Sequence, residues 1–296
     1  MDQEKIKQAG EIASKTVEHA KSFIEKGQSL KEIAEKIEAK IVELGGKPAF
    51  PVTTSINEVA AHFTPSPEDE SKAHGLLKID LGVHIDGWIA DTAFSLDLEN
   101  NKENKKLIQT AEKALEEGFS EIQEGVQVSQ IGKKVQETIE SEGLLPITNL
   151  SGHSIDQYNL HSGVTIPNND DGSTDEIDQG QFAIEPFVTT GSANGKIYEG
   201  KPSGIYVLED DKKPRSPIAR EVLQYVLENY QTLPFCSRWL VKEFGKKAIL
   251  GLRQLESNGN LHHYGMLIES SGHKVTQKEY TFIVNEEGKP EKTTNH

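Results

Sequence analysis

Residues 76–98, LLKIDLGVHIDGWIADTAFSLDL, decide the fold, because they read as two β-strands joined by a tight turn. Apolar and β-branched residues stand on both sides of Asp86-Gly87, and an Asp-Gly dipeptide in that setting is a strong signal for a two-residue hairpin loop. If these two residues form the loop, Ile85 pairs with Trp88 and the register of the whole hairpin follows. The sequence therefore predicts an antiparallel hairpin that turns at Asp86 and Gly87.

Two aspartates share one face of this predicted hairpin. The register places Gly82 opposite Asp91, and Asp80 lies two residues from Gly82, so its side chain points to the same face. Asp80 and Asp91 are then diagonal neighbours, roughly 7 Å apart at the backbone. Two surface aspartates on a solvated face are the alternative interpretation. Asp91, however, lies in the uncharged stretch IADTA (89–93), and a carboxylate in a buried strand needs a compensating charge such as a metal ion.

Potential metal ligands recur in three later segments, each of which reads as a strand. These are residues 149–167 (NLSGHSIDQYNLHSGVTIP) with His153 and His161, residues 181–187 (QFAIEPF) with Glu185, and residues 275–284 (VTQKEYTFIV) with Glu279. Each is weak on its own, because a glutamate in a strand is more often half exposed than bound to a metal. Together with the hairpin they supply four carboxylates and a histidine, the ligand types that hard or borderline divalent ions prefer.

Part of the chain repeats at an offset of 98 residues, which suggests an internal duplication. The matched pairs are Gly27 with Gly125, Leu30 with Val128, Ile33 with Ile131, Ile37 with Val135, Ile41 with Ile139, Gly45 with Gly143, and Pro48 with Pro146. Their spacing is that of an amphipathic helix that ends at a glycine and then a proline, and a further helix precedes each copy near residues 3–24 and 103–122. Chance similarity between two ordinary helices is the alternative, but His62 and His161 also follow the copies at similar offsets. The duplication predicts two half-domains related by a pseudo-two-fold axis, with a site at the seam between them.

The composition is that of an acidic globular protein. Its 296 residues carry a formal net charge of −15, which argues against nucleic acid or an anionic membrane as the main partner. The single cysteine, Cys236, excludes an intrachain disulfide and fits a reducing compartment. The N-terminal stretch MDQEKIKQAGEIASK has no apolar signal-peptide region, and no segment approaches the roughly 20 apolar residues of a membrane span. We therefore expect a cytoplasmic protein that does not contact membranes.

The sequence around these residues resembles a known family. The order Asp, Asp eleven residues later, His, Glu and Glu resembles that of the dinuclear metallopeptidases with the pita-bread fold, family M24. Six segments are similar to methionine aminopeptidase of type 2 in its archaeal form: KPAFP (47–51), SINEVAAHFTP (55–65), KIDLGVHIDGWIADTA (78–93), NLSGHSI (149–155), HSGVTIPN (161–168) and FAIEPF (182–187). The resemblance covers nearly the whole chain. It implies an α+β fold with pseudo-two-fold symmetry, the pita-bread or creatinase/aminopeptidase-like fold.

Position by position, the resemblance implies five metal ligands, Asp80, Asp91, His153, Glu185 and Glu279. Asp91 and Glu279 would bridge two divalent ions, Asp80 would bind one of these ions, and His153 with Glu185 would bind the other. The ligand set suits Co, Mn, Fe, Ni or Zn and does not choose among them.

The resemblance also implies residues that act on the substrate. His62 and His161 would flank the substrate and the tetrahedral intermediate, and Glu185 would relay a proton to the leaving amine as well as bind metal. Phe50 and Leu160 would help to line the methionine pocket. The implied activity is removal of the initiator methionine when the second residue is small, by a hydroxide that the two ions activate for attack on the first carbonyl.

The implied partners are the N-termini of newly made polypeptides, with transient contact to the ribosome, no specific nucleic acid, and a monomeric enzyme. An X-Pro peptidase of the same fold and a metal-free module that binds ribosomes or RNA are the alternatives, and the five retained ligands argue against the second. One departure concerns residues 277–281, where the family usually has Gln-Phe-Glu-His-Thr and this chain has QKEYT. Lys278 and Tyr280 thus leave open what supports Glu279.

An insertion separates the last two implied ligands. The 93 residues between Glu185 and Glu279 exceed what one strand connection needs. Residues 216–258 read as about three helices and residues near 261–269 as a strand, which is typical of a winged-helix-like subdomain. Residues 196–270 hold 11 Lys or Arg and 9 Asp or Glu, a net charge of +2 against −17 for the remainder, so we expect a structural lid beside the cleft rather than a nucleic-acid site. The predicted domains are a catalytic domain (1–195 and 271–296) and the inserted subdomain (196–270).

Overall fold

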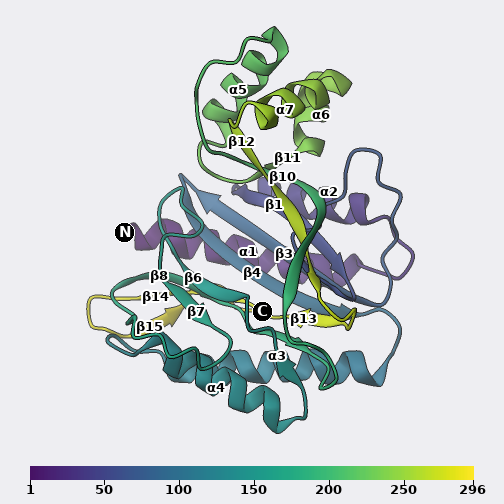
Figure 1. The fold of residues 1–296 in the computed structure, drawn as a ribbon. Helices are drawn as coiled ribbons and strands as arrows, with labels where there is room; N and C mark the ends of the chain where they lie inside the picture. Colours follow the sequence, from purple (N-terminus) through teal and green to yellow (C-terminus); the bar gives the residue numbers. More distant parts are fainter.

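The computed structural model describes residues 1–296, and its helices follow the duplication seen in the sequence. Two helices belong to each copy: α1 (Gln3–Phe23) and α2 (Leu30–Glu43), then α3 (Lys102–Ser120) and α4 (Val128–Ser141) (Figure 1). The helices α2 and α4 begin and end 98 residues apart. Each ends before a left-handed glycine, with φ of 91° at Gly45 and 70° at Gly143, as the sequence predicts. No helix of the chain combines the length and the apolar composition needed to cross a membrane.

The hairpin forms in the predicted register. The first half contains a sheet of three strands in the order β1 (Lys47–Ile56), β3 (Leu76–Ile85) and β4 (Trp88–Asp97). Gly82 lies opposite Asp91, as expected. Asp86 and Gly87 have φ values of 49° and 86°, and two positive values are typical of a type I′ turn, whose twist matches that of the flanking strands.

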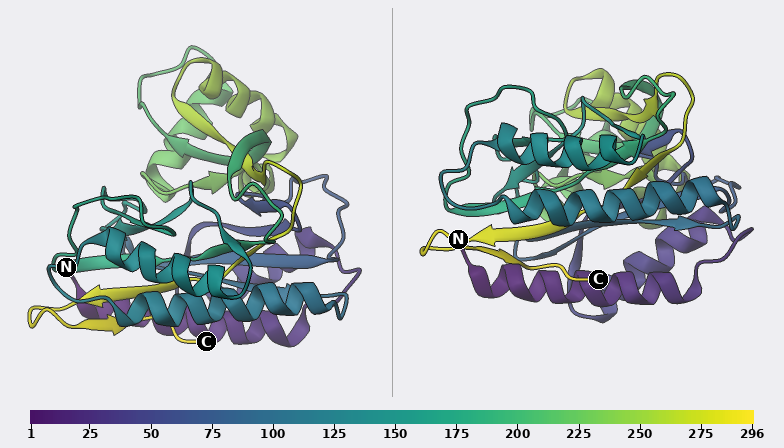
Figure 2. Two further views of the ribbon diagram at one scale, coloured as in Figure 1. Left: turned by 60° about the horizontal axis from the view of Figure 1, so that its bottom comes forward. Right: turned by 90° about the horizontal axis from the view of Figure 1, so that it is seen from below.

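The second half is built from two smaller sheets. One has the strand order β15-β14-β8-β6-β7 and the other β13-β9-β5. Their strands are β5 (Leu145–Pro146), β6 (Ser151–Ile155), β7 (Thr165–Pro167), β8 (Gly180–Ile184), β9 (Phe187–Thr189), β13 (Val275–Gln277), β14 (Tyr280–Val284) and β15 (Pro290–Lys292). Each half has its own buried apolar clusters between its helices and its strands. In Figure 2 the helices of both halves lie on the outer side of the strands, which leaves the strands to form the seam.

The two halves meet where β4 runs beside β13 and β14. The amide of Glu279 donates to the carbonyl of Ala93 at 3.1 Å, and side-chain hydroxyls close the rest of the seam. Thr92 Oγ1 donates to the Glu279 carbonyl at 2.8 Å, and Thr281 Oγ1 donates to the Asp91 carbonyl at 2.7 Å. These crossed contacts hold Asp91 from one half next to Glu279 from the other.

The insertion contains three α-helices, as predicted, together with three strands. Its elements are β10 (Ile197–Leu208), α5 (Pro217–Asn229), β11 (Phe235–Cys236), α6 (Ser237–Phe244), the 3₁₀ turn η1 (Gly245–Lys247), α7 (Ala248–Ser257) and β12 (Leu261–Glu269). They share a separate buried apolar cluster, and Figure 1 shows α5–α7 standing apart from the other helices. The strand β12 also pairs with β2 (Val59–Ala61), so the insertion contacts the strand that immediately precedes His62.

A buried ion pair joins the insertion to the first half. Arg238 of α6 donates two hydrogen bonds, of 2.6 and 2.8 Å, to the carboxylate of Glu38 in α2. The same guanidinium donates to the Pro65 carbonyl at 3.3 Å, and Trp239 Nε1 donates to Glu38 at 2.9 Å. Because loss of either charge would leave the other buried and unpaired, this contact fixes the insertion against α2 and the loop after His62.

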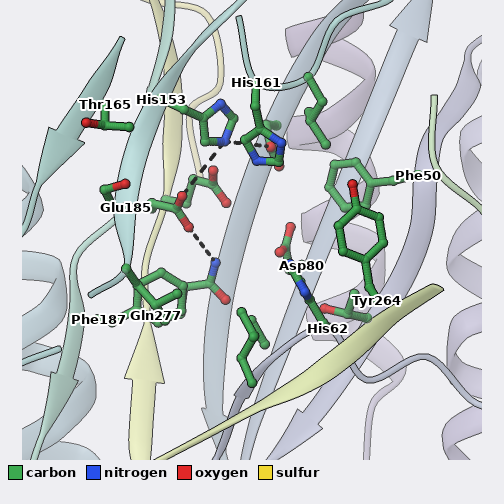
Figure 3. A pocket seen from close by; sticks show the side chains of 18 of the residues that line it. Phe50, His62, Asp80, His153, His161, Thr165, Glu185, Phe187, Tyr264 and Gln277 are labelled. Atoms are coloured by element: carbon green, nitrogen blue, oxygen red, sulfur yellow. Dashed lines mark hydrogen bonds and ion pairs between the residues drawn. The ribbon is translucent and has the colours of Figure 1, made fainter. Parts of the chain in front are cut away.

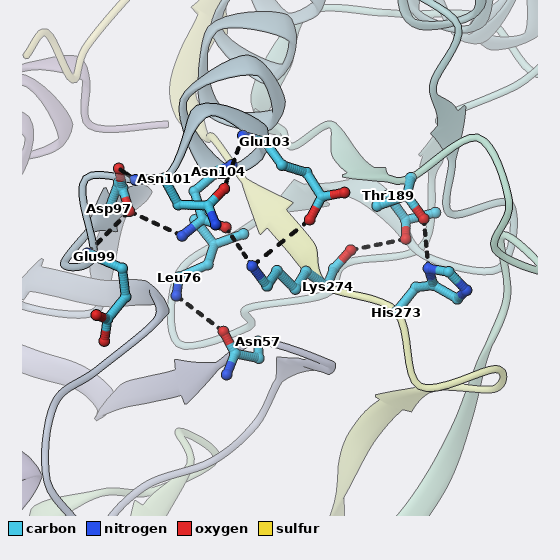
Figure 4. Close-up of polar contacts among 11 residues, drawn as sticks. Asn57, Leu76, Asp97, Glu99, Asn101, Glu103, Asn104, Thr189, His273 and Lys274 are labelled. Atoms are coloured by element: carbon cyan, nitrogen blue, oxygen red, sulfur yellow. Dashed lines mark hydrogen bonds and ion pairs between the residues drawn. The ribbon is translucent and has the colours of Figure 1, made fainter.

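Polar contacts hold the chain where it returns from the insertion (Figure 4). Lys274 Nζ donates to Asn104 Oδ1 at 2.8 Å, and Asn104 Nδ2 donates to Asp97 at the end of β4 at 2.9 Å. Thr189 Oγ1 donates to the Lys274 carbonyl at 2.8 Å. Segments from β4, α3 and β9 therefore converge on the residue that precedes β13, which sets the position of Glu279 a few residues later.

Candidate metal centre

A cavity of about 470 Å³ lies at the seam between the halves (Figure 3). Its lining includes every residue that the sequence singled out for a site: Phe50, His62, Asp80, Asp91, His153, Leu160, His161, Glu185 and Glu279. These residues come from both copies of the duplication. The seam therefore brings together what the chain separates by more than two hundred residues.

Each candidate ligand stands on or beside a different strand. Asp80 lies on β3, Asp91 on β4 and His153 on β6, as expected. The sequence predicted that the other two lie within strands, and this prediction is wrong. Glu185 follows the end of β8, and Glu279 falls between β13 and β14. Pro186, which has no backbone N–H, follows Glu185. The backbone of Glu279 pairs with Ala93 across the seam and not with a strand of its own sheet. These breaks in strand pairing turn both carboxylates toward the cavity.

The five side chains converge on one volume. His153 Nε2 lies 3.6 Å from Asp91 Oδ2 and 3.8 Å from Glu185 Oε1. Asp91, His153 and Glu279 each offer one ligand atom within 4.8 Å of the others, and the carboxyl group of Asp80 hydrogen-bonds with that of Asp91. Buried oxygens of Asp80, Asp91 and Glu279 have no hydrogen-bond partner in the protein. An unpaired buried carboxylate is costly, so this donor set fits a divalent cation.

The carboxyl groups raise one another's pKa. Burial raises the pKa of Asp80 to about 7, against hydrogen bonds with Gln277 and Asp91 that act to lower it. Burial also raises the pKa of Asp91, and the charges of Asp80 and Glu185 act in the same direction. The pKa values of Glu185 and Glu279 are raised by burial first and by the neighbouring carboxylates second. A bound cation would reverse this effect and keep the group ionised.

Without metal, Asp80 should contribute a loss of stability as the pH rises from about 5.5 to 8. The pKa of Asp80 is about 7 in the folded chain against an ordinary 3.8, so the folded state holds more protons than the unfolded state between these values, and its stability falls as pH rises through that window. Asp80 alone contributes about 2 kcal/mol to this loss. Thermal unfolding in a chelator at the two pH values measures this contribution as the difference between the wild type and Asp80→Asn, which should lack it. The same change of stability with pH in both proteins would contradict the arrangement.

Two histidines and an apolar wall lie beside the candidate ligands. The ring of His161 stands edge-on to that of His153, with centroids 4.2 Å apart, and the ring of His62 lies 5.5 Å from that of Tyr264. Burial lowers the pKa of His62 to about 4, with His161 acting in the same direction. Phe50 adds an aromatic surface on the same side of the cavity as Tyr264 (Figure 3).

Sequence reasoning does not find two residues that belong to this site. Tyr264 reaches the cavity from β12 of the insertion, and nothing in the sequence around it signals that position. Gln277 Nε2 donates to Glu185 Oε2 at 3.3 Å and hydrogen-bonds with Asp80. For Gln277 a signal exists, since an uncharged amide two residues before a candidate ligand is well placed to hold neighbouring carboxylates.

Comparison with known proteins assigns the chain to a family. The model of metallopeptidase family M24 matches residues 4–216. The methionine aminopeptidase of Pyrococcus horikoshii is 46% identical over 294 residues, which cover 97% of this chain and 98% of that protein. The methionine aminopeptidase of Methanocaldococcus jannaschii is 42% identical over 288 residues, which cover 96% of each.

Solved structures agree with this fold. The structure of a thermophilic Arx1 superposes with a TM-score of 0.83 at 15% identity, covering 98% of this chain and 89% of that one. The methionine aminopeptidase of Thermotoga maritima gives a TM-score of 0.70 at 20% identity, covering 99% and 96%. The pita-bread fold and the resemblance to methionine aminopeptidases that the sequence motifs indicated are thus confirmed. The chain belongs to metallopeptidase family M24, with archaeal methionine aminopeptidases among its relatives.

Proposed function

We propose that this chain is a methionine aminopeptidase, a metal-dependent hydrolase that removes the initiator methionine from proteins whose second residue is small. The observation that supports the proposal is the convergence of five candidate metal ligands, three of them buried, in one cavity that also has an apolar wall. Relatives that are 42% and 46% identical over almost the whole chain carry that name.

The cavity would hold two divalent ions, bound by Asp80, Asp91, His153, Glu185 and Glu279. Asp91 and Glu279 come from opposite halves and meet at the seam, a position that suits ligands shared by both ions. Asp80 would complete one ion's ligands, and His153 with Glu185 would complete the other's. Such ions supply Lewis-acid chemistry, since they lower the pKa of water and polarise a carbonyl oxygen. Co, Mn, Fe, Ni and Zn all suit these ligands.

The remaining polar residues would act on the substrate. A neutral imidazole at His161, beside His153, can donate a hydrogen bond to the oxygen on which negative charge develops. His62 lines the same cavity, its Nδ1 atom has no hydrogen-bond partner in the protein, and its ring could bond to a bound peptide. The carboxylate of Glu185 lines the cavity beside His153, so besides binding metal it could accept a proton from water and pass it to the leaving amine.

An apolar pocket would select the first residue. Phe50 and Leu160 line the cavity beside the candidate ligands. Methionine has an unbranched, flexible and polarizable side chain that fills a narrow apolar space of this kind. We therefore expect methionine and norleucine to be preferred over branched residues at the first position.

A panel of short peptides tests this function. Met-Ala-Ser should be cleaved and Ala-Pro-Ala should not, with each metal in turn, whereas an X-Pro peptidase of the same fold would show the reverse. Met-Asp-Ser should be cleaved slowest, because an aspartate near four carboxylates adds a like charge in a poorly screened cleft and weakens binding several-fold or more. The rate of methionine release is the measurement.

The salt dependence of the same panel separates bulk from charge. If bulk alone excludes the second residue, Met-Lys-Ser fails as Met-Asp-Ser does. If charge contributes, Met-Lys-Ser is cleaved faster at low salt, and the difference shrinks as salt rises. Efficient and equal cleavage of all three methionyl peptides would contradict a restricted pocket and with it the proposed activity.

We also propose to divide the chain into a catalytic domain (1–195 and 271–296) and an inserted subdomain (196–270) that acts as a lid beside the cleft. The separate apolar cluster of the insertion and the place of Tyr264 in the cavity support this division. We also propose a monomeric enzyme that works in the cytoplasm, acts on the N-termini of newly made polypeptides and meets the ribosome transiently.

A further inference from the structure

A chain of hydrogen bonds runs from His296 to the backbone of Glu279. His296 Nδ1 lies 3.0 Å from Lys278 Nζ, and His296 Nε2 lies 2.7 Å from Thr92 Oγ1. Thr92 Oγ1 in turn lies 2.8 Å from the carbonyl oxygen of Glu279. Because successive residues of a strand point to opposite faces, Thr92 lies behind the face from which Asp91 enters the cavity. His296 therefore reaches the metal centre from its rear.

The direction of these hydrogen bonds follows from which atoms can donate. The ammonium group of Lys278 can only donate, so Nδ1 of His296 accepts. Burial lowers the pKa of His296 to about 2, and the charge of Lys278 acts in the same direction, so the ring is neutral and its one proton is on Nε2. That proton is donated to Thr92, which leaves the single hydroxyl proton of Thr92 for the carbonyl of Glu279. Every donor in the chain thus points toward Glu279.

The segment that carries His296 is docked over its length. The amide of Thr293 donates to the carbonyl of Thr281 at 2.9 Å. Thr293 also passes so close to α1 that a Cβ atom on Gly10 would lie 1.9 Å from its carbonyl oxygen, so this approach requires a glycine. Figure 2 shows the C-terminal segment lying along α1.

The two residues that flank Glu279, Lys278 and Tyr280, both contact His296. Lys278 Nζ also donates to the main-chain oxygen of His296 at 3.2 Å, and Tyr280 Oη donates to the same oxygen at 3.0 Å. The ring of Tyr280 stands edge-on to the imidazole, with centroids 5.3 Å apart. Lys278 and Tyr280 thus form a binding site for His296 on either side of Glu279.

We propose that His296 is a positioning residue of the metal centre, which holds the Thr92 hydroxyl on the Glu279 carbonyl and thereby orients the carboxylates of Glu279 and Asp91. This inference rests on the proposed function, since it assumes that both carboxylates bind metal. Groups that orient metal ligands typically change metal affinity by about 10- to 100-fold when they are removed.

The test compares His296→Phe with His296→Gln by calorimetric titration of Mn²⁺ into chelator-stripped protein. Phenylalanine keeps the contacts with the rings of Phe94 and Tyr280 but removes both hydrogen bonds, so Mn²⁺ affinity should fall by about 10-fold or more. Glutamine can accept from Lys278 and donate to Thr92, so it should stay within about threefold of the wild type. His296→Leu replaces the phenylalanine variant if that variant does not fold, as judged by thermal unfolding in chelator.

A double-mutant cycle with Thr92→Val separates positioning from a general loss of stability. If His296 acts through the Thr92 hydroxyl, Thr92→Val alone should weaken Mn²⁺ binding at least as much, and adding His296→Phe should weaken it little further. Asn295 is exposed on the same segment, so Asn295→Ala is the matched control and should bind Mn²⁺ as the wild type does.

The outcomes of these measurements distinguish the possibilities. Wild-type affinity in His296→Phe, additive effects with Thr92→Val, or an equal loss in Asn295→Ala would each overturn the role of the His296 ring. If the wild-type chain itself binds no Mn²⁺, the proposed metal centre fails instead. Wild-type binding of two ions together with unchanged binding in His296→Phe would leave the proposed function intact and refute this inference alone.

Discussion

Asp91→Asn and Glu279→Gln should each lose both metal ions and, with them, nearly all activity. Each substitution keeps the shape of the side chain and removes one negative charge at the point where the two halves meet. Because both carboxylates would be shared by the two ions, neither ion keeps its full set of ligands. A catalytic metal ion stabilises the transition state by several kcal/mol, and each 1.4 kcal/mol of activation free energy changes the rate about tenfold. The value of kcat/KM should therefore fall by at least about 10³-fold.

Metal analysis after dialysis measures the loss of the ions directly. Asp86→Asn is the matched control, since it makes the same change of charge in the same hairpin at a side chain that is 72% exposed. Asparagine also tolerates the φ of 49° at this turn position, so the hairpin should keep its register. Two ions per chain in either Asp91→Asn or Glu279→Gln would show that the carboxylate concerned does not bridge.

The parts of the fold that could be predicted are those set by local chemistry. The Asp86-Gly87 turn determines the register of β3 and β4, because a slip of one residue would move every side chain to the wrong face. Gly45 and Gly143 end their helices where a left-handed residue is needed. The strand β10 gives no such signal, since its middle reads GKPSG (200–204), and its pairing depends on a partner that lies beyond three helices.

The same distinction applies to the site. Asp80, Asp91 and His153 could be found because polar residues that interrupt apolar strands are conspicuous in the sequence. Tyr264 and His296 could not, since each reaches the surroundings of the candidate metal centre through tertiary contacts. Tyr264 does so by way of the insertion, and His296 by the docking of the last segment on α1. Spacing along the chain carries no information about contacts of this kind.

His62→Ala and His161→Ala should lower kcat by about 10²-fold or more, the scale for losing an oxyanion donor or an acid–base group, and should leave the metal content normal. Neither histidine is among the five candidate ligands, yet both line the cavity beside them. Burial lowers the pKa of His62 to about 4 and also lowers the pKa of His161, so each ring is neutral at pH 7 and can form a hydrogen bond with the substrate.

A second substitution is needed at His62, because its backbone φ of 65° lies in the left-handed region and alanine itself could disturb it. Asparagine tolerates that conformation better than alanine does and still carries an N–H donor, so His62→Asn should lose less activity than His62→Ala. His74→Ala, at an exposed histidine that does not line the cavity, is the histidine control and should be fully active. Metal content measured on the same samples decides the roles. If His161→Ala loses metal together with activity, its contact with His153 serves the ions rather than the substrate, and the division between metal-binding and substrate-binding residues is wrong.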